Sequence, residues 1–137
     1  MRPGGYLRNC RAKSVSCGRR VDLDNRYFRS AWEANYARYL NFLVKHKSIF
    51  KWEYEVDTFW FEGIKRGCRF YTPDFKIWEA VTDTPYYIEI KGWMDQKSAT
   101  KLNRMQKYYP DIKVILVQKK EYEALKKSIK SMIPGWE

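Results

Sequence analysis

The chain has 137 residues, the size of a single domain with one sizeable hydrophobic core. Its residues are 45% hydrophobic and 18% aromatic, which excludes a chain that is disordered throughout. Lysine and arginine number 27 against 16 aspartates and glutamates, and the resulting net charge of +11 favours a polyanionic partner, most commonly nucleic acid. No apolar run approaches the roughly 20 residues needed to span a membrane, and no secretory signal is recognisable, so we expect a cytoplasmic protein.

Residues 1–29 form a strongly basic segment with almost no hydrophobic periodicity. They carry eight lysine or arginine residues and two aspartates, a net charge of +6. Such a pattern predicts an extended or partly disordered basic arm, which either is a solvated tail or orders on DNA by gripping phosphates. We favour the second interpretation, and the candidate DNA contacts are Arg11, Lys13, Arg19 and Arg20.

From Ser30 onward the pattern is that of a helix. Trp32 and Leu40 belong to an apolar series at helical spacing, which predicts a helix from about residue 31 to about residue 46. Ser30 is a good N-cap, and Glu33, three residues later, would complete a capping box. We therefore expect the folded domain to comprise residues 30–137.

The remainder of the chain alternates between strand and helix patterns. The predicted elements are strands at about 49–61, 68–79 and 86–91, a helix at about 95–108, a strand at 112–117 and a helix at about 120–132. The apolar run 112–117 is typical of a central strand that is buried on both faces. The predicted order is α-β-β-β-α-β-α, and the unit from 86 to 117 should form a right-handed parallel crossover.

The three cysteines, Cys10, Cys17 and Cys68, are odd in number and widely spaced, so they do not suggest a disulfide framework. With the single His46 they could in principle form a four-ligand zinc site, but the close Cys-x-x-Cys pairs typical of such sites are missing. Reduced thiols are the expectation for a cytoplasmic protein.

Three charged residues lie inside the apolar patterns of neighbouring predicted strands. Side chains alternate along a strand, so Glu89 and Lys91 share one face. A hairpin can bring Asp74 beside Glu89, where two carboxylates would repel unless a cation lay between them. Carboxylate oxygens are the ligands that Mg²⁺ prefers, and Lys91 could orient a water or neutralise a phosphate. The alternatives are a buried ion pair that supports the sheet, which stabilises poorly, or charges along a solvated edge.

Pro73-Asp74 followed by Glu89-Ile90-Lys91 is similar to the motif of the PD-(D/E)xK nucleases. Within that superfamily the chain most resembles the phage endonuclease I family of Holliday-junction resolvases, over roughly residues 30 to 117. The segments that carry the resemblance are Ser30-Ala31-Trp32-Glu33, Phe50-Lys51-Trp52-Glu53-Tyr54-Glu55, Tyr71-Thr72-Pro73-Asp74-Phe75 and Glu89-Ile90-Lys91-Gly92. The stretch between Asp74 and Glu89 is longer than in that family, which bears on the DNA substrate more than on the chemistry.

The resemblance implies an α/β fold with a restriction-endonuclease-like core, a mixed β-sheet flanked by helices. It implies that Asp74 and Glu89 hold Mg²⁺, for which Mn²⁺ would substitute, with help from the backbone carbonyl of Ile90. Lys91 would position or deprotonate the attacking water. Glu33 would complete the site from the first helix, through a second metal ion or a bound water, although a capping box alone also explains a glutamate there.

These features predict a metal-dependent endonuclease that hydrolyses phosphodiester bonds in DNA. The resemblance favours branched DNA as the substrate, a homodimer that cuts two strands symmetrically, and the cytoplasm of a bacterial or phage-infected cell. A homing or nicking endonuclease that reads duplex sequence is an alternative, and a non-catalytic nucleic-acid-binding protein is a less favoured one. Further candidate DNA contacts, at a turn and on the helix after the site, are Lys65, Arg66, Lys97 and Lys101.

Overall fold

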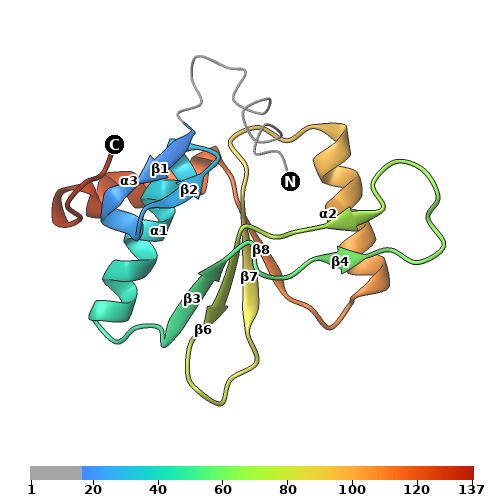
Figure 1. The fold of residues 1–137 in the computed structure, drawn as a ribbon, viewed down its shortest axis with the longest axis horizontal. Coiled ribbons are helices and arrows are strands. Elements are labelled where there is room, and N and C mark those ends of the chain that lie inside the picture. Colours follow the sequence, from blue (N-terminus) through green and yellow to red (C-terminus); the bar gives the residue numbers. More distant parts are fainter. Residues whose placement is uncertain (1–16) are drawn as a thin grey trace.

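The structure, a computed structural model, describes residues 17–137 and has a mixed α/β architecture (Figure 1). A four-stranded sheet is flanked by helices, and two two-stranded ribbons are attached to it. Within residues 17–137, every helix is too short or too polar to cross a membrane. In chain order the elements are β1 (Gly18–Arg20), η3 (Val21–Leu23), β2 (Arg26–Phe28), α1 (Ala31–Lys45), β3 (Lys51–Tyr54), β4 (Phe59–Trp60), β5 (Phe70–Tyr71), β6 (Phe75–Trp78), β7 (Tyr86–Ile90), α2 (Gln96–Tyr108), β8 (Val114–Val117), α3 (Lys119–Ile129) and η4 (Lys130–Met132).

The four-stranded sheet has the order β3-β6-β7-β8 and contains both strand directions. β3 pairs with β6 and β6 with β7 in antiparallel register, whereas β7 and β8 run parallel and are joined through α2. The parallel connection predicted between residues 86 and 117 is therefore present. The 13 residues of α2 provide the length that the return to a parallel strand requires.

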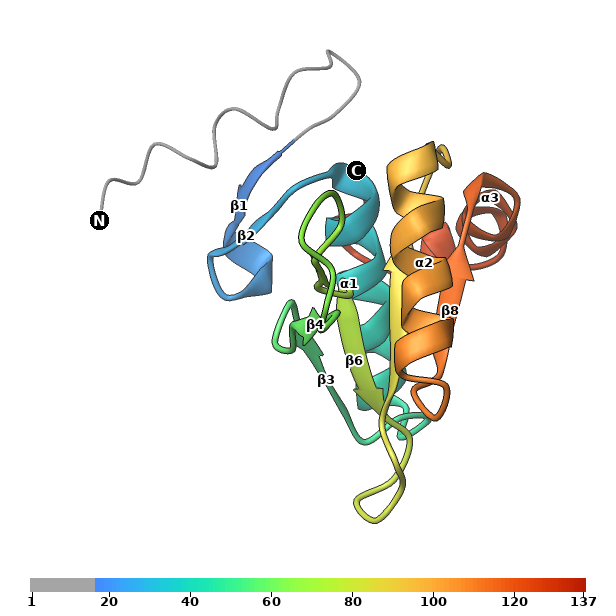
Figure 2. The ribbon, with the colours of Figure 1, turned by 90° about the vertical axis from the view of Figure 1, so that its right-hand side faces the viewer.

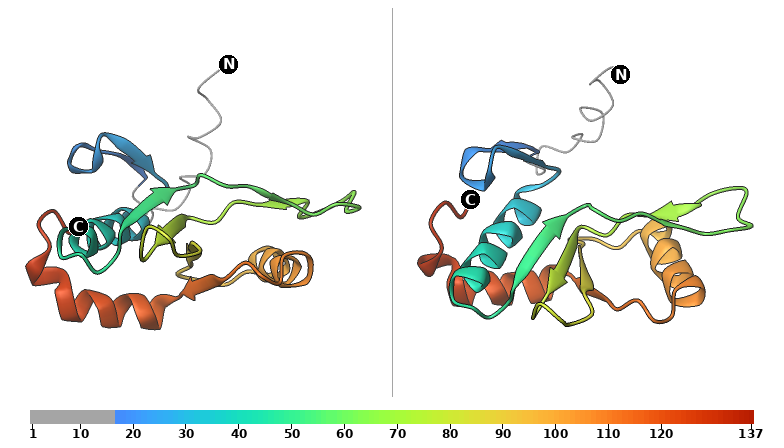
Figure 3. Two further views of the ribbon diagram at one scale, coloured as in Figure 1. Left: turned by 90° about the horizontal axis from the view of Figure 1, so that it is seen from below. Right: turned by 60° about the horizontal axis from the view of Figure 1, so that its bottom comes forward.

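Helices α1 and α3 cover one face of the sheet, and α2 with the β4–β5 ribbon covers the other (Figures 1 and 3). The larger core lies under α1, where Leu40 packs with Phe75 of the sheet. Trp32 at the start of α1 stacks on Tyr122 of α3 with ring centroids 4.1 Å apart. The smaller core lies under α2 and contains Met105. Side chains of β7 alternate between these two layers, so charged residues on one face of this strand point away from the larger core.

The helix predicted from residue 31 to residue 46 is confirmed as α1. Ser30 accepts a hydrogen bond from the amide of Glu33 at 3.1 Å, and His46 is the C-cap. The helices predicted at 95–108 and 120–132 correspond to α2 and to α3 with its extension η4. These elements are predictable because capping residues and an apolar stripe are local features of the sequence.

Two predictions about the strands are wrong. The stretches 49–61 and 68–79 are each split, because the chain leaves the sheet to form the β4–β5 ribbon, which extends away from it (Figure 3). β8 is an edge strand and not a central one, and its Ile115 is 37% exposed. An apolar run indicates a strand but not its place in the sheet, since that place depends on which strands pair.

Part of the predicted basic arm is a β-hairpin. Strands β1 and β2 pair in antiparallel register beside the start of α1 (Figure 2). Phe28 is fully buried and Leu23 is 4% exposed, and both belong to the larger core. The turn uses Asp24 and Asn25 in the left-handed conformation, which these short polar residues tolerate. An extended arm over residues 1–29 is therefore wrong for residues 18–28, and residues 1–16 lie outside the described part of the chain.

The expectation of reduced cysteines holds for one of the two described cysteines. Cys68 is a buried free thiol, and it contacts the backbone carbonyl of Lys97 at 3.6 Å. Cys17 is disulfide-bonded, against the expectation. Cys10 lies outside the described residues.

Candidate active site

A cleft of about 820 Å³ opens beside the N-terminus of α1, the C-terminal end of β7 and the start of α2. Glu33, Asp74 and Glu89, the three predicted carboxylates, line it together with Lys91. These residues come from a helix, from the segment that leads into β6, and from β7 and its C-terminal extension. The tertiary structure therefore brings all four predicted site residues to one place.

Asp74 directly precedes β6 and is almost fully buried, with 1% exposure. The β6–β7 ladder pairs Phe75 with Ile88, so Asp74 and Glu89 stand opposite each other one step beyond it. The amide of Ile90 donates a hydrogen bond to Asp74 Oδ2 at 2.7 Å. Burial first, and then the negative charge of Glu89, raise the pKa of Asp74 well above its ordinary value. A cation next to this carboxyl would favour its charged form.

Glu89 is held by a tyrosine from the β4–β5 ribbon. Tyr71 donates its hydroxyl hydrogen to Glu89 Oε2 at 2.7 Å. Burial raises the pKa of Glu89, although the hydrogen bond from Tyr71 and the charges of Arg29 and Lys91 oppose this rise. Burial and the charge of Glu89 also raise the pKa of Tyr71, so its hydroxyl stays a donor. Tyr71 lies in a segment that resembles the nuclease family, but its contact with Glu89 depends on where the ribbon lies over the sheet and has no signal in the sequence.

Glu33 lies in the first turn of α1 and is 7% exposed. Its amide is capped by Ser30, but its side chain points toward the sheet. The hydroxyl of Tyr54 on β3 donates to Glu33 Oε2 at 2.5 Å, and Arg29 Nε lies 3.8 Å from the same oxygen. The helix cap therefore explains the backbone contact of Glu33 but not the position of its carboxylate.

Arg29 is a member of this cluster that the sequence pattern misses. Its Nη2 lies 2.8 Å from Asp74 Oδ1 and 2.7 Å from Glu55 Oε1. Burial alone would lower the pKa of Arg29, but the charges of Glu33, Asp74 and Glu55 raise it, so the guanidinium stays protonated. One signal is present in the sequence: Arg29 precedes the helix N-cap and lies four residues before Glu33, the spacing of neighbours along one side of a helix.

Lys91 follows β7 and lines the cleft on the same strand face as Glu89. Its amide donates to the carbonyl of Val117 at 2.9 Å, which continues the parallel β7–β8 ladder by one residue. Ile90 contributes its amide to Asp74, whereas a metal-ligand role for its carbonyl stays a prediction. The half-buried Lys91 is thus fixed at its backbone, and its charge acts on the neighbouring carboxylate of Glu89.

The carboxylates of Glu33, Glu55 and Asp74 already contact a cation, the guanidinium of Arg29. Carboxylate oxygens are the donors that a hard divalent ion such as Mg²⁺ prefers, so Asp74, Glu89 and Glu33 fit such an ion by their chemistry. Within residues 17–137, no three His, Cys, Asp or Glu side chains are grouped closely enough to form a metal-ligand set as they stand. In this arrangement Arg29 balances part of the negative charge of the cluster.

The predicted DNA contacts fall in separate regions. Lys101 lines the cleft, and Lys97 is exposed one turn earlier on α2. Lys65 and Arg66 are exposed in the loop between β4 and β5, which projects from the body of the molecule (Figure 1). Arg19 is exposed on β1 and donates to the backbone carbonyl of Asn25 at 2.8 Å. These cations could therefore contact a large DNA ligand at more than one point.

The assignment of Arg20 as a DNA contact is wrong. Arg20 is buried, and its Nε and Nη2 donate to the carboxylate of Glu137 at 2.8 and 2.7 Å. Arg20 thus joins the β1–β2 hairpin to Glu137, and the number of charges in the basic segment does not predict this partner. Arg11 and Lys13 lie outside the described residues.

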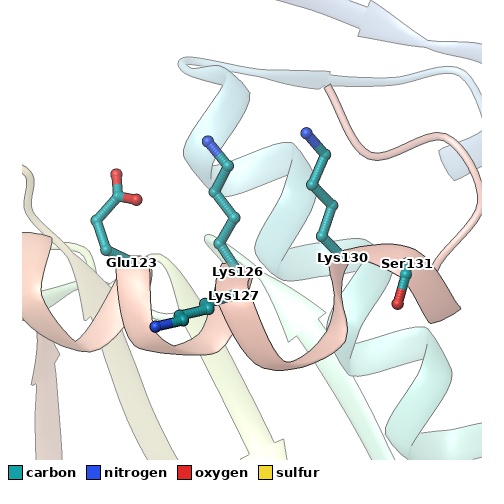
Figure 4. Close-up of a pocket in the computed structure, with 5 residues that line it drawn as sticks. All are labelled: Glu123, Lys126, Lys127, Lys130 and Ser131. Atoms are coloured by element: carbon teal, nitrogen blue, oxygen red, sulfur yellow. The ribbon is translucent and has the colours of Figure 1, made fainter.

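A second hollow, of about 490 Å³, lies on α3 and η4 and is rich in lysine (Figure 4). Lys126 and Lys130 project in the same direction, whereas Lys127 points aside. This hollow shares no lining residue with the carboxylate cleft. It is a further positively charged surface, and no motif in the sequence indicates it.

Comparisons with known proteins add no assignment to this geometry. No protein-family profile matches the chain, and neither the curated proteins nor the solved structures gave a significant match. The residues and their arrangement therefore carry the functional interpretation.

Proposed function

We propose that the protein is a metal-dependent endonuclease of the PD-(D/E)xK type, with a restriction-endonuclease-like core, that hydrolyses phosphodiester bonds in DNA. The observation that carries this proposal is that Asp74, Glu89 and Lys91 converge in one cleft. They follow one another along the chain in the order of the motif, and they lie on or next to the paired strands β6 and β7. A purely structural ion network is less favoured, because the free energy lost when charged groups are removed from water offsets much of their mutual attraction.

The residues of the cleft divide the chemistry among them. A divalent ion, Mg²⁺ or Mn²⁺, would polarise the phosphate and lower the pKa of a water molecule. Asp74 and Glu89 would hold that ion, with the carbonyl of Ile90 as a further ligand. Lys91 would orient the attacking water and balance the negative charge that develops on the phosphate. Glu33 would complete the site from the start of α1, through a second metal ion or a bound water.

The distribution of cations supports an extended, branched ligand. Lys97 and Lys101 lie on α2 at the cleft, and Lys65 and Arg66 lie on the projecting β4–β5 ribbon. A branched DNA has arms in several directions and could meet both regions, which agrees with the resemblance to junction resolvases. A homodimer would then present two clefts to two strands and cut them symmetrically.

The test compares a four-way junction, a linear duplex and a nicked plasmid at equal salt, each with Mg²⁺, with Ca²⁺ and with EDTA. We expect the junction to be cut fastest, with cleavage in Mg²⁺ only and with binding but no turnover in Ca²⁺. Preferred cleavage at one duplex sequence would instead favour a homing or nicking endonuclease. Cleavage in EDTA would contradict a metal-dependent mechanism.

A non-catalytic nucleic-acid-binding protein is the alternative that one observation favours. Arg29 already compensates Asp74 and Glu55, so the cluster has a counter-ion without a metal. This alternative predicts no cleavage of any substrate and the same DNA affinity with and without Mg²⁺. An Asp74→Asn protein purified in parallel separates activity of this chain from that of a contaminating nuclease.

A further inference from the structure

The guanidinium group of Arg29 lies where the carboxylates of Glu33, Glu55 and Asp74 converge. Arg29 lies 2.8 Å from Asp74, 2.7 Å from Glu55 and 3.8 Å from Glu33, measured between charged atoms. Arginine does not lose its proton in proteins, so this cation cannot become neutral to make room for another. A second cation at these carboxylates must therefore displace Arg29 or share the site with it.

The contacts of Asp74 make this competition direct. Its Oδ2 accepts a hydrogen bond from the amide of Ile90 at 2.7 Å, and its Oδ1 accepts one from Arg29 at 2.8 Å. Each oxygen thus already has one donor, and Arg29 at Oδ1 is the donor that a side-chain movement can remove. Two cations close to one buried oxygen repel each other strongly, because water screens charges poorly where it is excluded.

The backbone at Arg29 is anchored, whereas its side chain has room to turn. Phe28 on one side is fully buried, and Ser30 on the other caps α1. The side chain of Arg29 is 44% exposed and lines the cleft. The side chain of Glu55 is 31% exposed and shares the guanidinium with Asp74. A displaced guanidinium can thus leave Asp74 and keep Glu55 as its partner without movement of the backbone.

We propose that Arg29 is the counter-cation of the metal site when no metal is bound. A divalent ion that binds Asp74 displaces the guanidinium of Arg29 from Oδ1. The displaced guanidinium stays paired with Glu55 at the cleft, where it can contact a phosphate of DNA. This inference rests on the proposed function. Metal binding and release of Arg29 are then one exchange. The cleft gains positive charge only in the metal-bound form, so a phosphate is attracted to the form that can act on it.

The exchange is tested on the full-length, DNA-free protein by calorimetric titration with Mg²⁺. Removal of the competing cation in Arg29→Met should tighten Mg²⁺ binding by about tenfold or more, because a like charge a few ångströms away opposes the ion. Arg26→Met is the matched control, since it removes the same charge from a guanidinium that lies 5.2 Å from the ring of Trp52. This control should change the Mg²⁺ affinity by less than about twofold, since Arg26 does not line the cleft and salt screens charges at a distance.

Two further measurements test the exchange even if Arg29→Met folds poorly. Its melting midpoint in EDTA should fall below that of the wild type, and Mg²⁺ should raise it by more than it raises the wild-type midpoint. In the wild type, the NMR signal of the Arg29 Nε–H group should shift when diamagnetic Mg²⁺ is added, because the guanidinium changes partner. The NMR measurement needs no substitution.

The outcomes separate the exchange from the nuclease proposal. Tighter Mg²⁺ binding by Arg29→Met, together with a shifted Arg29 signal in the wild type, supports the exchange. Equal or weaker Mg²⁺ binding by Arg29→Met, or an unchanged Arg29 signal in a wild type that binds Mg²⁺, overturns the exchange and leaves the nuclease proposal standing. Failure of both proteins to bind Mg²⁺ overturns both proposals.

Discussion

The hydroxyl of Tyr54 lies 2.5 Å from Oε2 of Glu33, so a residue of strand β3 holds a carboxylate of helix α1 toward the cleft. Burial first, and then the charge of Glu33, raise the pKa of Tyr54, so the hydroxyl remains the donor. The helix cap uses only the backbone amide of Glu33. The two roles of this glutamate, in the cap and in the cleft, are therefore carried by different atoms and can be tested separately.

Glu33→Gln should lower the cleavage rate by about a hundredfold or more, the size expected when a group that handles a proton is removed. Its melting midpoint should change little, because glutamine keeps a side-chain oxygen for the hydroxyl of Tyr54 and its backbone amide still donates to Ser30. Tyr54→Phe should reduce cleavage less and lower the free energy of unfolding by about 1–2 kcal/mol, since it removes one hydrogen bond to a charged group. Rates and melting curves of the purified variants provide the measurement.

Ser30→Ala is the control for this pair. It removes the cap and should lower the free energy of unfolding by about 1 kcal/mol while the carboxylate of Glu33 is kept. Full activity in Glu33→Gln would show that this glutamate is outside the catalytic site.

Asp74→Asn and Glu89→Gln should both abolish cleavage, but they should differ in stability. Arg29 and Ile90 donate to different oxygens of Asp74, and asparagine has an amide nitrogen in one of these two positions, so one donor loses its acceptor. Asp74→Asn should therefore also melt earlier in EDTA. Glu89→Gln keeps an oxygen for the hydroxyl of Tyr71 and should melt nearly as the wild type does. Both should bind DNA as tightly or more tightly, because a negative charge near the phosphates is removed.

Glu53→Gln is the matched control, because Glu53 is a carboxylate on β3 with a side chain that is 40% exposed, paired with Lys51 on the surface. It should cut DNA at the wild-type rate. Cleavage by Asp74→Asn or Glu89→Gln at a similar rate would show that the site is wrongly assigned.

The stability of the metal-free protein should depend on pH through Asp74 and Glu89. Burial is the first cause of the raised pKa of each. A raised carboxyl pKa means that the folded state holds the proton more tightly than the unfolded chain does, so the resulting stabilisation is complete below the ordinary pKa of about 4 and is lost as the pH rises through the raised value. Mg²⁺ binds the deprotonated carboxylates, so the rise in melting midpoint that it causes should grow over the same interval.

Melting curves recorded in EDTA and in Mg²⁺ over a series of pH values check this prediction. Hydrogen bonds from Arg38 lower the pKa of Asp22, and hydrogen bonds from Arg20 lower the pKa of Glu137, so these groups lose stabilisation as the pH falls. They act equally with and without Mg²⁺, and the difference between the two series isolates the cleft. A Mg²⁺ effect that does not vary with pH would contradict the involvement of these carboxyls.

Deletion of residues 1–16, combined with Cys17→Ser because Cys17 is disulfide-bonded, should leave the fold in place and weaken DNA binding. This segment carries four cations, and each phosphate that they no longer neutralise should reduce the slope of log affinity against log salt by about 0.9. Affinities at three salt concentrations, on a junction and on a duplex, measure the effect. Loss of the preference for one DNA, with general affinity retained, would show that the segment reads shape and does not only grip phosphates.

A deletion that continues through the hairpin should instead unfold the protein. Phe28 is fully buried, and Phe28→Ala alone should cost about 3–5 kcal/mol of unfolding free energy. Thermal melts of the two truncations and of Phe28→Ala test this boundary. A folded protein that lacks residues 1–28 would show that the hairpin is dispensable for the core.

The sequence by itself determined the features that depend on near neighbours. The Ser30 cap and the apolar stripe behind it indicate α1, because a helix repeats its contacts every three or four residues. Alternation along β7 places Glu89 and Lys91 on one face. A short antiparallel connection from β6 to β7 then brings Asp74 opposite Glu89. The convergence of Asp74, Glu89 and Lys91 was predictable because each of these steps is a local rule, whereas the place of Glu33 at the cleft was expected only from the family resemblance.

The tertiary structure alone decided which partners the charged residues have. Arg20 and Arg29 look alike in a basic segment, yet Arg20 binds Glu137 at the C-terminus and Arg29 binds Asp74 in the cleft. Tyr54 and Tyr71 lie in segments that resemble the nuclease family, but the sequence does not indicate that their hydroxyls hold Glu33 and Glu89. The partners of ionic contacts and side-chain hydrogen bonds cannot be predicted from a repeating sequence pattern. The strength of these contacts depends on distance and burial in the folded molecule.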